Sequence, residues 1–189
     1  MGRILVIGLG PAGLDRLDPA ARERLEDPHR RVIVRTLEHP AARQLADLRT
    51  VESGDDAYET AATLEDAYRA IVERVVAAAA GHDVVYAIPG SALVGERTVA
   101  MLRAAAAERG FECEVMPGES FLDLVFGRLE IDPLRRGVQV LDGRALPDPL
   151  PLHLPTVIAQ VDRPVILADV VAVLGKILPD ETPVTVLTE

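Results

Sequence analysis

Near its beginning the chain reads Arg3-Ile4-Leu5-Val6-Ile7-Gly8-Leu9-Gly10-Pro11-Ala12-Gly13, a continuous aliphatic run followed by a glycine-rich loop. An apolar run without polar alternation is typical of a strand buried on both faces, as in a parallel sheet. Asp18 followed by Pro19 is typical of a helix start, because aspartate caps free amides and proline suits the first helical position. This stretch therefore predicts a strand, a loop and a helix, the first unit of an α/β fold.

The same order recurs along much of the chain. Further strands are predicted at 32–34, 84–88 and 112–116, and helices at 18–27, 40–48, 64–79, 94–109 and 121–129. In the helix at 64–79 apolar residues recur at helical spacing, and Gly81 supplies a stop. Gly54-Asp55-Asp56 is interpreted as a polar turn. Repeated strand–loop–helix units predict a parallel sheet with right-handed crossovers.

The pattern changes after the helix at 121–129. Strands are predicted at 138–141, 156–161 and 184–187, with a helix at 165–178 begun by Pro164, and the proline-rich stretch 142–155 is interpreted as a linker or excursion. Because the chain stops directly after the last predicted strand, we expect the second sheet to be incomplete. The predicted fold class is α/β, with an N-terminal lobe at 1–116 and a truncated C-terminal α/β lobe at 117–189.

Composition and charge narrow the possible partners. The net charge of -10 argues against a nucleic-acid partner, because phosphate binding needs a basic face. The single cysteine, Cys113, excludes an intrachain disulfide and fits a reducing compartment. The apolar runs are too short for a signal peptide or for the roughly 20 residues that span a bilayer. We therefore expect a cytoplasmic protein with no membrane partner.

Metal ligands are not evident in the sequence. The histidines are scattered without the spacing of a metal site. Asp55-Asp56 followed by Glu59 is the one acidic cluster with a composition suited to Mg²⁺, but a solvated turn is the commoner meaning of such a cluster. We predict no metal site.

The glycine loop matches the dinucleotide fingerprint G-x-G-x-x-G, at Gly8, Gly10 and Gly13. That fingerprint requires a helix beginning inside the glycine run, so that its amides face a pyrophosphate. Here the predicted helix starts later, and Asp15 lies where the pyrophosphate would be. The second strand ends in Arg35-Thr36 rather than an acid, although an arginine suits the 2′-phosphate of NADP. A nicotinamide-dependent reductase is therefore disfavoured but stays open.

Several segments, taken together, resemble one family. The opening loop is similar to the G-x-G-P-G-D loop of tetrapyrrole (corrin/porphyrin) methylases, with the acid displaced by one residue to Asp15. Five further segments resemble the methylase-like domain that precedes a MazG-type nucleotide pyrophosphohydrolase. They are Arg35-Thr36-Leu37-Glu38-His39-Pro40, Asp55-Asp56-Ala57-Tyr58-Glu59, the run from Tyr86 to Val99, the run from Pro117 to Asp123, and Ile131-Asp132-Pro133. The resemblance covers nearly the whole chain, in order.

The resemblance implies two lobes with S-adenosyl-L-methionine held between them. It places the cofactor against Pro89, Gly90, Ser91, Leu93, Ser120, Phe121, Ala159, Gln160 and Val161. It assigns the glycine loop to the substrate, through Gly8, Gly10, Pro11, Gly13 and Asp15. It also implies a homodimer and a MazG domain beyond this chain. Pro89-Gly90-Ser91 stands where many members have G-D-P, so an acid is missing from the cofactor loop.

Residue chemistry supplies candidates for the acceptor side of a methyl transfer. They are Arg35, His39, Asp56 and Tyr58. Arg35 ends a predicted strand, where it suits an acceptor carboxylate, whereas His39 is more readily explained as a helix-start residue. Ser91 is expected to cap the helix that follows it, and the amides there favour a carboxylate.

Two functions from different classes follow. The first is an S-adenosylmethionine-dependent methyltransferase acting on an unidentified small-molecule acceptor. The second is a regulatory module that binds S-adenosylmethionine or a nucleoside for an attached pyrophosphohydrolase, which the missing acid favours. Detectable methyl transfer distinguishes them.

Overall fold

The computed structural model describes residues 2–188. The chain divides into two compact units, Met1–Asp123 (unit 1) and Leu124–Glu189 (unit 2). The division falls inside a helix and lies after the expected boundary at Met116. It is displaced because the loop after Met116 still packs on unit 1, where Pro117 O accepts the Ala92 N–H at 2.7 Å.

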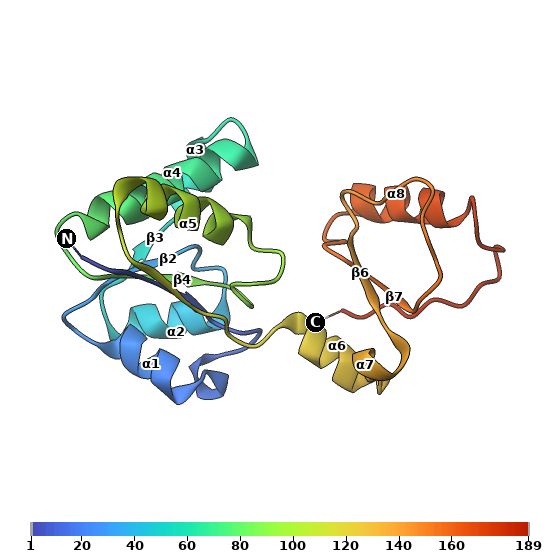
Figure 1. Ribbon diagram of the computed structural model, residues 1–189, viewed down its shortest axis with the longest axis horizontal. Helices are drawn as coiled ribbons and strands as arrows, with labels where there is room; N and C mark the ends of the chain where they lie inside the picture. The colour runs from blue at the N-terminus through green and yellow to red at the C-terminus, as the bar shows by residue number, and fades with distance from the viewer. Residues whose placement is uncertain (1, 189) are drawn as a thin grey trace. The chain divides into compact units, whose positions relative to one another are not determined.

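Unit 1 is a five-stranded parallel sheet with helices on both faces (Figure 1). The strands are β1 (Ile4–Gly8), β2 (Arg31–Val34), β3 (Glu52–Ser53), β4 (Val84–Ile88) and β5 (Cys113–Met116), in the order β3-β2-β4-β1-β5. The helices are η1 (Leu14–Arg16), α1 (Pro19–Glu26), α2 (Pro40–Leu48), α3 (Asp55–Thr60), α4 (Leu64–Ala79) and α5 (Arg97–Arg109). The predicted α/β class and parallel sheet are confirmed.

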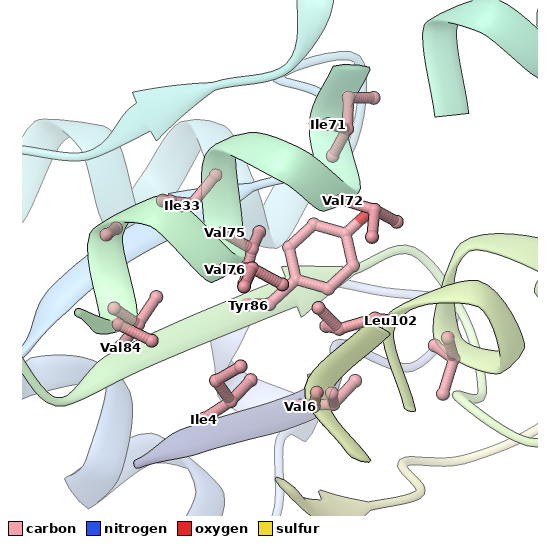
Figure 2. Close-up of a cluster of buried hydrophobic side chains, with 14 of the residues drawn as sticks. Ile4, Val6, Ile33, Ile71, Val72, Val75, Val76, Val84, Tyr86 and Leu102 are labelled. Atoms are coloured by element: carbon pink, nitrogen blue, oxygen red, sulfur yellow. The ribbon is translucent and has the colours of Figure 1, made fainter. Parts of the chain in front are cut away.

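Side-chain alternation along the strands divides the core into two layers. Ile4 and Val6 of β1 and Tyr86 of β4 face α4 and α5, where the Tyr86 ring lies beside Val72 and Leu102 (Figure 2). The intervening residues of the same strands face α1 and α2 instead. Both faces of β1 and β4 are buried, which is why the sequences of these strands are continuous apolar runs.

Unit 2 is smaller. It contains most of α6 (Phe121–Leu129), then α7 (Pro133–Arg136), β6 (Gln139–Asp142), β7 (Thr156–Ala159) and α8 (Pro164–Leu174). β6 and β7 pair in parallel, and the stretch between them carries no helix or strand. The helix predicted to run to 178 ends at Leu174, and the strand predicted to run to 161 ends at Ala159.

Two predictions of secondary structure are wrong, and one predicted helix starts later than expected. Residues 184–187 form no strand: within 2–188 they pair with neither β6 nor β7, and Val184 and Val186 are 65% and 73% exposed. Apolar residues alone do not make a strand when no neighbour takes up their backbone groups.

The supposed turn at Gly54-Asp55-Asp56 is the start of α3, preceded by the unpredicted β3. Two acids in a first helical turn complement the helix dipole, so their polarity does not require a turn.

The helix predicted to start at 94 is α5, which starts at Arg97 because Gly95 has a φ of 68° and Glu96 is the cap.

Candidate functional site

The loops after β1, β4 and β5 are held together by backbone hydrogen bonds and close backbone contacts at the carboxyl edge of the unit 1 sheet. Gly10 and Gly90 exchange both backbone hydrogen bonds, each at 3.0 Å. A Cβ on Gly8 would lie 1.9 Å from Pro117 O, and a Cβ on Gly118 would lie 2.3 Å from Gly8 O. Only glycine permits this approach of backbones, so the glycine loop has a structural role before any ligand is considered.

Gly90 combines a special backbone conformation with an open face. Its φ is 66°, and a Cβ built on it meets no atom within 4 Å. In the same loop Ser91 and Ala92 are buried, whereas Leu93 is 62% exposed. A ligand can therefore approach the backbone at Gly90 closely, and Leu93 offers an apolar contact beside it.

Ser91 does not cap α5 as expected. The helix begins later, and Glu96 accepts the Thr98 N–H at 3.0 Å instead. The Ser91 hydroxyl accepts the Leu93 N–H at 3.3 Å, which stabilises the loop itself.

A cavity of about 540 Å³ lies beside the glycine loop, within unit 1. Its lining is Gly8, Leu9, Gly10, Arg16, Leu17, Asp18, Ala21, Met116, Pro117, Gly118 and Glu119. Of the predicted substrate-loop residues, Gly8 and Gly10 line it, and Pro11, Gly13 and Asp15 do not. Arg16 and Glu119 form an ion pair across 3.6 Å, so the lining carries both signs of charge.

His39 and Asp56, two of the acceptor-side candidates, make internal contacts. His39 is 8% exposed, and its Nε2 donates to Gly10 O at 3.0 Å, which holds the glycine loop. Asp56 forms a bidentate ion pair with Arg74, at 2.8 and 2.6 Å, and this pair lowers the pKa of the Asp56 carboxyl.

Arg35 lies next to a carboxylate that sequence reasoning missed. Its Nη1 is 3.0 Å from Glu96 Oε2, and the two side chains are 24% and 5% exposed. Thr98 Oγ1 donates to Glu96 at 2.6 Å and shares a second hydrogen bond with the Tyr86 hydroxyl at 2.9 Å. No local pattern pairs Glu96 with Arg35, although an acid near a helix start is favoured by the helix dipole.

Tyr58 is half-buried, with its ring packed edge-on against Tyr68 at 6.1 Å. Burial raises the pKa of the Tyr58 hydroxyl to about 12, so it is a neutral donor at physiological pH.

The remaining predicted cofactor residues fall in both units. Ser120 Oγ accepts the Leu122 N–H at 3.1 Å and so caps α6, which begins at Phe121. Ala159 ends β7, and Gln160 follows with a φ of 59° and its side-chain oxygen 2.8 Å from Arg144. Gln160 and Val161 are partly exposed within unit 2.

Residues 2–188 contain neither a cluster of metal-binding side chains nor a membrane-spanning helix. No group of acidic, histidine or cysteine side chains is arranged to hold a metal ion. None of the helices in this range has the length and apolar character needed to cross a membrane.

Comparison with known proteins identifies the family. The model described as Tetrapyrrole (Corrin/Porphyrin) Methylases matches residues 3–189. The chain is 34% identical to YabN of Bacillus subtilis (strain 168) over 189 residues, which comprise 99% of this chain and 38% of YabN. It therefore spans well under half of that relative.

Solved structures agree on the fold. A uroporphyrin-III-C-methyltransferase from Thermus thermophilus is 25% identical with a TM-score of 0.59, over 79% of this chain and 64% of that one. A diphthine synthase at 14% identity has a TM-score of 0.59, over 92% of this chain and 72% of that one, and shows the fold alone. This chain belongs to the tetrapyrrole (corrin/porphyrin) methylase family.

Proposed function

We propose that this chain is an S-adenosyl-L-methionine-dependent methyltransferase domain acting on an unidentified small-molecule acceptor. The observation that carries the proposal is the open backbone at Gly90, held in place by the interlocked loops of a tetrapyrrole methylase domain. The fold is shared with a uroporphyrin-III C-methyltransferase whose solved complex, at 20% identity and a TM-score of 0.52, holds S-adenyl homocysteine.

The chemistry suits such a site. S-adenosylmethionine carries no phosphate, so its binding needs backbone donors and acceptors together with an apolar wall. Pro89, Gly90, Ser91 and Leu93 offer this combination in unit 1. When bound, the cofactor supplies an electrophilic methyl group.

Residues of this chain contribute mainly by holding the reactants. Methyl transfer is an in-line displacement, for which positioning supplies much of the rate gain. The internal contacts of His39, Asp56 and Arg35 agree with a site that orients an acceptor rather than one built around a dedicated base.

The same contacts favour a second candidate, a module that binds S-adenosylmethionine or a nucleoside without catalysis. Because the chain spans 38% of YabN, we propose that such a module regulates a MazG-type pyrophosphohydrolase elsewhere in a longer polypeptide. We also propose that the protein acts as a homodimer in the cytoplasm; sedimentation analysis tests the oligomeric state.

Calorimetric titration with S-adenosylmethionine, S-adenosylhomocysteine and NADPH tests the proposal. We expect binding of the first two and not of NADPH. In Gly90→Ala the affinity is expected to fall about tenfold or more, because the new methyl group occupies the open space above the loop. Gly110→Ala is the matched control, since Gly110 has a φ of 75° and equally open surroundings but ends α5 away from the loop.

Transfer of a labelled methyl group from S-adenosylmethionine to a small-molecule extract then separates the two functions. Labelled product supports the methyltransferase. Binding without any labelled product supports the regulatory module, and binding of NADPH alone contradicts both.

A further inference from the structure

Glu96 is a charged side chain in an almost fully buried position. Its side chain is 5% exposed, and it is the residue directly before α5. One carboxylate oxygen accepts the Thr98 N–H at 3.0 Å and the Thr98 hydroxyl at 2.6 Å, and the other lies 3.0 Å from Arg35 Nη1. A buried carboxylate is stable only when charge and hydrogen bonds compensate its lost hydration, which these contacts provide.

These contacts join elements that are distant in sequence. Arg35 continues β2, where its backbone N–H donates to Ala87 O of β4 at 2.8 Å. Thr98 lies in the first turn of α5, and its hydroxyl is 2.9 Å from that of Tyr86 in β4. The Glu96 carboxylate therefore ties the end of the 89–96 loop to two strands of the sheet and to a helix.

The first half of this loop is held differently. The Gly90 backbone pairs with Gly10, and the Ala92 N–H donates to Pro117 O at 2.7 Å. After Val94, whose N–H donates to Ser91 O at 3.3 Å, Gly95 turns the chain with a φ of 68°. Glu96 follows at once, so its carboxylate fixes the second half of the loop.

From this arrangement we infer that Glu96, together with Arg35, is a positioning residue for the 89–96 loop and sets its affinity for S-adenosylmethionine without touching the ligand. The inference rests on the proposed function, because it concerns the same loop. It assigns to Arg35 the role of partner to Glu96 rather than of direct contact with the acceptor.

The experiment compares Glu96→Gln and Glu96→Ala with Arg49→Ala. Arg49 donates to the carbonyl oxygens of Leu25 at 2.8 Å and Arg30 at 2.6 Å, so its loss destabilises unit 1 away from the loop. Calorimetry gives the affinity for S-adenosylmethionine at a temperature where all variants are folded. Hydrogen exchange gives the protection of amides 91–98.

We expect S-adenosylmethionine to bind Glu96→Ala about tenfold more weakly than wild type, with faster exchange confined to 91–98. Arg49→Ala should lose stability yet keep the wild-type affinity. In the double variant Arg35→Met with Glu96→Gln, affinity should be no lower than in either single variant, because the two residues act as one pair.

Three results overturn the inference. If both Glu96 variants keep the wild-type affinity and the wild-type exchange of the loop, the inference fails while the proposed function stands. The same holds if Arg49→Ala loses as much affinity as Glu96→Ala. Failure of the wild-type protein to bind S-adenosylmethionine overturns the proposed function with it. If Glu96→Ala does not fold, Glu96→Gln decides, since it keeps the side-chain volume and one acceptor oxygen.

Discussion

Gly118 and Gly110 have nearly the same backbone angle in very different surroundings. Their φ values are 74° and 75°, but a Cβ on Gly118 would lie 2.3 Å from Gly8 O, and one on Gly110 meets nothing within 4 Å. Gly110→Ala should cost about 1 kcal/mol of unfolding free energy, the cost of a left-handed alanine.

Gly118→Ala should cost clearly more, about 3 kcal/mol or above, because backbone must also shift. Urea unfolding measures both variants. Equal losses would show that the loop after β5 yields freely and that its contact with Gly8 is unimportant.

Asp55, at the ends of β2 and β3, makes the stability of the fold depend on pH in the acidic range. Burial alone would raise the pKa of its carboxyl, but hydrogen bonds from Ser53, Thr36 and the Leu37 N–H outweigh burial and hold the pKa below its ordinary value of 3.8. The folded state thus binds fewer protons than the unfolded state in this range, and its stabilisation is present above pH 3.8 and lost as the pH falls through the lowered value.

In Asp55→Asn the unfolding free energy should therefore decrease less steeply with falling pH below about pH 4 than in the wild-type protein. Chemical denaturation at a series of pH values gives the slope. Parallel curves for wild type and variant would mean that Asp55 adds nothing to acid sensitivity.

On the scale of elements, α1 depends on its N-terminal cap. Asp18 Oδ1 accepts the N–H groups of Ala20 at 2.9 Å and Ala21 at 3.2 Å. Asp18→Ala should lower the unfolding free energy by about 1 kcal/mol, whereas Asp18→Asn, which keeps an acceptor oxygen, should cost less. Thermal unfolding of the two variants side by side makes the comparison, and an equal loss in both would assign the effect to charge instead of capping.

At the scale of the whole molecule, the two units differ in how many apolar side chains their cores bury. The buried residues of the sheet layers all belong to unit 1, whereas in the described part of unit 2 only Leu150 and Val170 are buried apolar side chains. Local stability follows buried apolar contacts.

We therefore expect backbone amides of β6, β7 and α8 to exchange with deuterium much faster than those of β1 and β4. Hydrogen exchange followed by mass spectrometry checks this order. Comparable protection in both units would show that unit 2 gains stability from contacts beyond its own small core.

Local patterns in the chain were enough to predict the framework of unit 1. Three features depend only on residues a few positions apart and could therefore be predicted from sequence. They are the apolar runs of β1 and β4, the Asp18-Pro19 start of α1 and the helical spacing in α4. The family resemblance also followed from ordered motifs, and it is confirmed.

Contacts between residues far apart in the sequence could not be predicted in this way. The two-residue β3 exists because β2 offers it a partner, whereas 184–187, although apolar, has none among the described strands. The contact of Glu96 with Arg35 likewise joins residues brought together by the order of the strands. A strand is stable only when a neighbouring strand takes up its backbone hydrogen bonds, and a buried charge only when an opposite charge or hydrogen bonds compensate it. Which residues lie close enough to do this depends on the packed fold rather than on nearby sequence.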